Sequence, residues 1–219
     1  MKRITQDGER FEFISKGIGL FEFIYTMIGT ANFFFLFILV VIGSMVMARE
    51  VECKEIDLYV YRIAKRIKII VSKAGAMQVV ITLYYLIIIA LSTAVYLRSA
   101  DVAKYGIWSI VDADINKYIV TIVAVYLGTT VISIFCIFVG VWQKAFATFS
   151  IVFILYIISM YFDNFKFMRN YFPEHFAHNL VVNGLYNSLT IVFYFSVYVA
   201  YIVIWMVLSS ISFAKKEFQ

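Results

Sequence analysis

The sequence has little of what keeps a protein soluble in water. Charged residues make up only 15% of its 219 positions and hydrophobic residues 63%, whereas soluble domains average about 25% charged and about 45–50% apolar residues. There is one proline, Pro173, and there are two cysteines, Cys53 in a charged segment and Cys136 in an apolar one. We therefore expect no water-soluble core, no disulfide between these cysteines and no cysteine metal site.

Motifs that would carry catalysis are also missing. The sequence has no Gly-x-x-x-x-Gly-Lys-Ser/Thr run to cradle a phosphate and no Gly-x-Ser-x-Gly, and no charged residue lies in the middle of an apolar stretch. His175 and His178 are three residues apart beside Glu174, but zinc normally takes at least three protein ligands in a shielded pocket. We therefore favour a plain interfacial segment there. We expect no enzyme activity, no metal and no cofactor bound by this chain itself.

Long uncharged stretches dominate what is present. Each is close to the ~20 residues that a helix needs to cross a bilayer, and together they predict an all-α, polytopic membrane helical bundle with about five transmembrane helices. The chain forms a single transmembrane domain over 1–219 in this interpretation. The net charge of +5 suits anionic lipid headgroups, and we expect membrane lipids as partners and no nucleic acid. The predicted spans are 23–48, 74–97, 118–143, 145–162 and 189–211.

The distribution of lysine and arginine predicts the orientation. These residues gather in 49–73, at Lys144 and at 215–216, which alternating crossings place on one side, and we assign that side to the cytoplasm of a bacterial cell. The C-terminus is then cytoplasmic, and 163–187 forms an extracellular loop. The N-terminal arm, 1–27, is basic yet would lie outside. Either the positive-inside rule fails there or a sixth span exists, and we favour an interfacial helix within the arm.

The connection 49–73 carries the strongest functional signal. Between Ile56 and Ile70 apolar residues recur at helical spacing, and basic residues fill much of the rest. This pattern predicts an amphipathic helix with a cationic face. Such a helix can lie on the inner leaflet and bind anionic lipid. It can also dock on a protein partner.

The spacing of charges in this connection resembles the first cytoplasmic loop of ABC-2 type transporter permeases. That loop has two acidic residues two positions apart, an arginine sixteen residues after the first acid, and a lysine seven residues further on. Glu50, Glu52, Arg66 and Lys73 stand at these offsets. The family loop also has a Gly-Thr pair and a Pro-x-Ser sequence, and this chain has other residues at those positions. The order of the later predicted spans and loops is also similar to that of the family.

The resemblance implies that the chain is the permease subunit of an ABC exporter. ATP and Mg²⁺ would be bound by separate ATP-binding subunits, and a second permease chain, identical or homologous, would complete the path. The cargo would be hydrophobic or amphipathic, such as a peptide, lipid or drug. The residues at or beside the ATPase-coupling contact would be Glu50, Glu52, Arg62, Arg66 and Lys73.

Polar residues within the spans are candidates for the substrate path. The alternative for each is a bond back to its own helix or packing against a neighbour. The chain as a whole also has an alternative function, that of a non-transporting immunity protein, sensor or assembly factor whose amphipathic helix binds lipid. The path candidates are Gln78, Thr82, Thr121, Thr129, Ser133 and Ser196.

Overall fold

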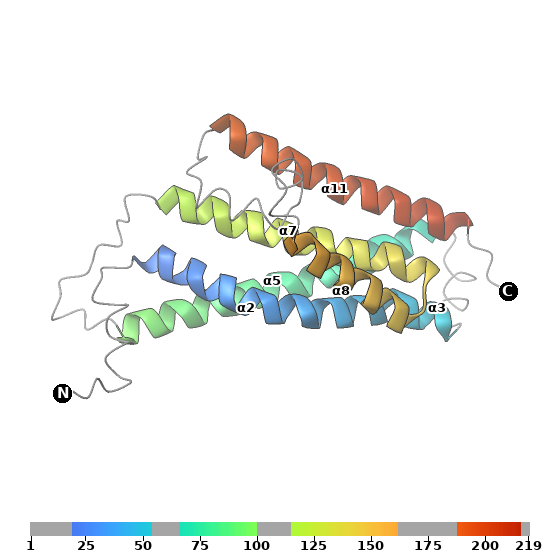
Figure 1. The fold of residues 1–219 in the computed structure, drawn as a ribbon, viewed down its shortest axis with the longest axis horizontal. Coiled ribbons are helices and arrows are strands. Elements are labelled where there is room, and N and C mark those ends of the chain that lie inside the picture. Colours follow the sequence, from blue (N-terminus) through green and yellow to red (C-terminus); the bar gives the residue numbers. More distant parts are fainter. Residues whose placement is uncertain (1–18, 54–65, 100–114, 162–187, 216–219) are drawn as a thin grey trace.

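The structure, a computed structural model, describes residues 19–53, 66–99, 115–161 and 188–215, and in these ranges every regular element is helical. The all-α prediction is confirmed for this part of the chain, and four of its helices are long and apolar enough to cross a membrane. Such helices suit lipid because they satisfy every internal backbone hydrogen bond themselves. The elements are α2 (Leu20–Ser44), the π-helical turn η1 (Met45–Arg49), α3 (Glu50–Glu52), α5 (Arg66–Ser99), α7 (Ile115–Trp142), α8 (Ala145–Tyr161) and α11 (Ser188–Lys215) (Figure 1).

The fourth predicted span forms a shorter helix than the others. α8 has 17 residues, which at 1.5 Å per residue extend about 25 Å, less than the hydrocarbon thickness of about 30 Å. It leaves the end of α7 after the turn at Gln143 and Lys144 and runs back along the bundle (Figure 1). The described part of the chain therefore contains four helices of spanning length and one shorter apolar helix.

Two of the helix boundaries change the interpretation of the flanking segments. α2 begins at Leu20, so the described end of the N-terminal arm belongs to the first long helix and not to a separate interfacial helix. Glu22 lies in its first turn, where the positive end of the helix dipole favours a carboxylate. α5 begins at Arg66, so the last residues of the 49–73 connection are part of that helix. Most of the predicted amphipathic helix, and the whole of 163–187, lie outside the described residues.

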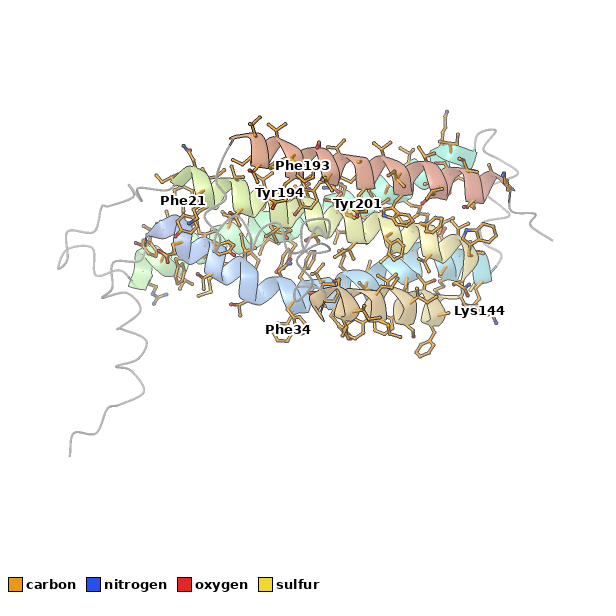
Figure 2. All side chains as sticks on the ribbon, turned by 45° about the horizontal axis from the view of Figure 1, so that its top comes forward. Phe21, Phe34, Lys144, Phe193, Tyr194 and Tyr201 are labelled. Atoms are coloured by element: carbon orange, nitrogen blue, oxygen red, sulfur yellow. The ribbon has the colours of Figure 1, made fainter. Side chains whose placement is uncertain are left out.

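α7 is the central helix of the bundle. It packs against α2, α5, α8 and α11. The main core lies where α2, α5 and α7 meet, and a second cluster joins α7 to α11 through Tyr194 and Tyr198. Large apolar side chains also cover the outside, among them Phe34, which points away from the bundle (Figure 2). The chain thus exposes apolar groups along its length, as a protein surrounded by lipid does.

The described residues that flank the basic connections lie at one end of the bundle. The end of α3, the start of α5, the α7–α8 turn with Lys144 and the end of α11 lie together (Figure 1). Exposed basic side chains at this end include Arg49, Lys68 and Lys215. This is the grouping that alternating crossings require, and we call it the basic end.

Candidate functional site

Two groups of polar side chains connect different helices in the described part of the bundle. One is an ion pair between Glu50 and Lys73 at the basic end, which we call the helix-end ion pair. The other lies half-way along the bundle, where side chains of α2, α5 and α7 are hydrogen-bonded to one another. We call it the mid-bundle network, and its members are Asn32, Gln78, Thr82, Tyr85, Tyr126 and Thr129.

The helix-end ion pair joins the end of the first long helix to the beginning of the second. Lys73 Nζ donates a hydrogen bond to Glu50 Oε1, and the two side chains are 24% and 22% exposed. The other carboxylate oxygen, Glu50 Oε2, is buried and has no hydrogen-bond partner among the described residues. Removal of one member of such a pair leaves a partly desolvated charge without compensation. The pair therefore ties the end of the first long helix to α5, about two turns after Arg66.

The other predicted coupling residues are placed differently. Glu52 is exposed at the end of α3 and forms no ion pair within the described part of the chain. Arg62 lies outside the described residues, and Arg66 is described only as the first residue of α5. Of the five residues, the structure thus brings together Glu50 and Lys73.

Tyr85 is the centre of the inner half of the mid-bundle network. Its hydroxyl group donates to Asn32 Oδ1 at 3.0 Å and lies 2.9 Å from Thr129 Oγ1. These contacts join α5 to α2 on one side and to α7 on the other. Tyr85 is only 4% exposed, so without them its hydroxyl group would be buried unpaired, at a cost of about 1–3 kcal/mol.

Tyr126 is the centre of the outer half of the mid-bundle network, which also contains Gln78 and Thr82. Its hydroxyl oxygen accepts a hydrogen bond from Gln78 Nε2 and lies 3.0 Å from Thr82 Oγ1. The Thr82 hydroxyl group donates to the carbonyl oxygen of Gln78 at 2.8 Å, so Tyr126 is the donor to Thr82. The rings of Tyr85 and Tyr126 meet edge to face with their centroids 5.4 Å apart. The two halves therefore form one continuous group.

The six predicted path residues divide into two sets. Gln78, Thr82 and Thr129 belong to the mid-bundle network and each reaches a neighbouring helix, while Thr82 and Thr129 are also within hydrogen-bond distance of carbonyl oxygens of their own helices. The other three donate to carbonyl oxygens of their own helices, which is the alternative given for them above. These bonds are Thr121 to Lys117 at 2.8 Å, Ser133 to Thr130 at 2.8 Å and Ser196 to Phe193 at 2.7 Å.

The sequence interpretation missed Asn32, Tyr85 and Tyr126. Asn32 had a usable signal, because an amide inside an apolar span costs free energy unless it finds a partner. The tyrosines had none, because the chain contains 16 of them and most serve as large apolar groups with a polar end. Only the packing of three helices selects Tyr85 and Tyr126.

The chemistry of the mid-bundle network is that of neutral donors and acceptors. Hydroxyl and amide groups can hold a polar part of a ligand, but none of them is charged at neutral pH. In the described ranges, no group of three or more His, Cys, Asp or Glu side chains is placed to hold a metal ion.

Comparisons with known proteins give no assignment. No protein-family model, no curated protein and no solved structure matches this chain.

Proposed function

We propose that this chain is the permease subunit of an ATP-driven ABC-2 type transporter, working with separate ATP-binding subunits and a second permease chain. The observation that carries the proposal is the contact between Glu50 and Lys73. Both residues stand at the offsets of the ABC-2 permease loop, and their ion pair joins the two ends of the 49–73 connection. In the proposed complex this connection is the part that docks on the ATP-binding subunit.

The pairing suggests how a push on the connection would reach the membrane. Glu50 ends the first long helix and Lys73 lies in the first turns of α5. Because the two are bonded, movement of the connection acts on both helices together. Because Glu50 and Lys73 pair with each other, we assign the direct contact with the ATPase to Glu52, Arg62 and Arg66. Charges at such a contact determine docking geometry more than affinity.

The cargo would be hydrophobic or amphipathic, such as a peptide, lipid or drug, and would be exported from a bacterial cell. The mid-bundle network supports this class because it offers hydrogen bonds without charge. A charged cargo or an ion relay would need ionisable groups at span depth. The mid-bundle residues Gln78, Thr82 and Thr129 remain our candidates for the path.

Purification from native membranes in mild detergent tests the proposal. We expect an ATP-binding subunit to co-purify with the tagged chain and to hydrolyse ATP. Glu50→Lys and Lys73→Glu should each reduce the yield of complex several-fold, and the double exchange should restore it, because the pair acts within the chain. Glu52→Lys should reduce it without restoration by Lys73→Glu.

A well-folded chain that purifies without any ATP-binding subunit would overturn the proposal. The alternative would then hold, in which an immunity protein, sensor or assembly factor binds lipid through the connection. Binding of the purified chain to vesicles containing anionic lipid, lost on removal of the basic residues of 54–68, would support that outcome.

A further inference from the structure

The first long helix contains a turn of a different kind just before Glu50. The segment Met45–Arg49 is π-helical and separates α2 from α3. A π-turn inserts an extra residue into an α-helix and occurs frequently at functional sites. No proline causes it, since Pro173 is the only one in the chain. At its start the Met45 N–H is shared between the carbonyl oxygens of Val41 and Ile42, and the Ser44 hydroxyl group also donates to Val41 O at 2.8 Å.

α7 presses its backbone against this turn. A Cβ atom on Gly140 would lie 3.2 Å from both Ala48 N and Met47 Cβ, and neither Met47 nor Ala48 is exposed at all. Just before the turn, a Cβ on Gly43 would lie 2.9 Å from Cys136 Cβ. The two helices therefore touch on both sides of the turn, at places where no larger residue fits without movement.

The helix-end ion pair lies directly beyond the turn. Glu50 is two residues from Ala48, where Gly140 makes its contact. Any rotation of the helix end about that contact moves the Glu50 carboxylate relative to Lys73. One carboxylate oxygen is buried without a partner among the described residues, so this arrangement leaves part of the charge unsatisfied. Packing against α7 holds Met47 and Ala48 in place, and beyond the turn Lys73 is the residue that pairs with Glu50 in the described part of the chain.

We propose that Met45–Arg49 is a joint, that the Gly140 contact is its pivot, and that the helix-end ion pair is the latch that holds it. When the latch opens, Glu50–Cys53 turns about the pivot, the π-turn changes toward α-helical bonding, and Leu20–Ser44 stays in place. Only the source of the push on the connection rests on the proposed function. The joint itself is a property of this chain alone.

Spin labels at the basic end test the joint without any partner subunit. Cys53 is exposed and Cys136 is buried, so a nitroxide reagent labels Cys53 selectively, and Lys144→Cys supplies a second label on the α7–α8 turn. Pulsed electron resonance in nanodiscs then gives the distance distribution between the two labels. We expect one distance in the parent chain, and a second distance when Lys73→Met opens the latch. Lys68→Met, which removes an exposed lysine of the same helix, should leave one.

Two further variants decide whether the turn is responsible. Deletion of Met45, an exposed residue of the turn, restores the α-helical residue count and should remove the second distance in the Lys73→Met background. If the deletion does not fold, Gly140→Ala in that background displaces the pivot and should change the second distance, while Gly29→Ala should leave it as it is, because Gly29 has open space around it. A single unchanged distance in Lys73→Met, or a second distance that stays the same in both turn variants, would overturn the proposal.

Discussion

The mid-bundle network and the helix-end ion pair are both polar contacts between helices, but they are built differently. In the network, neutral groups from three helices satisfy one another at lipid depth. In the ion pair, two charges join two helix ends, and one carboxylate oxygen remains buried without a partner among the described residues. The first arrangement holds helices together where no water can replace a broken bond. The second lies where a competing charge can reach it. The comparison indicates a bundle that is fixed in its middle and adjustable at its basic end.

The largest effect on stability should come from the ion pair. Lys73→Met leaves the Glu50 carboxylate partly buried with no counter-charge, and we expect the free energy of unfolding to fall by about 2 kcal/mol. Titration with sodium dodecyl sulfate in mixed micelles, followed by circular dichroism, measures it. Lys68→Met is the matched control and should change the value by less than about 0.5 kcal/mol. Equal losses in both variants would show that the pair contributes nothing specific.

Substitutions in the mid-bundle network should have an intermediate effect on stability. The adjacent residues Tyr84 and Tyr85 allow a direct comparison, because only Tyr85 belongs to the network. Tyr85→Phe removes the bonds to Asn32 and Thr129 and should cost about 1 kcal/mol, near the upper part of the range for polar contacts within membranes. The Tyr84 hydroxyl group is buried without a hydrogen-bond partner among the described residues. Tyr84→Phe should therefore be neutral or stabilising in the same titration. A larger loss for Tyr84→Phe than for Tyr85→Phe would contradict the network as described.

The smallest effects should distinguish bonds between helices from bonds within one. Thr82→Val removes the contact with Tyr126 in addition to a bond within its own helix and should cost about 0.5 kcal/mol. Ser196→Ala removes only a bond to its own helix on an exposed face, and its effect should be close to zero. Comparable losses for the two would mean that the outer half of the network adds little to the assembly of the bundle.

The sequence was sufficient to predict the helical class but not the ends of the helices. Uncharged stretches identify α2, α5, α7, α8 and α11 because lipid requires long apolar helices. The helices extend past the predicted spans, for instance over Glu22 and Lys73, which lie just outside the uncharged stretches. A helix continues past such residues because its backbone hydrogen bonds do not depend on side-chain polarity, and each charge has a favourable place there.

The candidate site was predictable only in part, for a related reason. Glu50 and Lys73 were two of the five residues that the resemblance to the permease loop grouped, and Gln78 was recognisable as an amide in an apolar span. The π-turn had no signal, because Met45–Arg49 contains neither proline nor glycine. The close contact on this turn comes from Gly140, about ninety residues away in the sequence. Contacts of this kind depend on how helices pack, which local composition does not encode.

Crosslinking from Cys53 in native membranes tests the central claim most directly. A photoactivatable maleimide on this exposed cysteine should form an adduct with an ATP-binding subunit, identified by its phosphate-binding loop, and the yield should change when ATP is added. The same reagent on Arg98→Cys in a Cys53→Ser background, at the opposite end of the bundle, should give no such adduct. Adducts from Cys53 to lipid alone, or equal labelling of the ATP-binding subunit from both ends, would contradict the account.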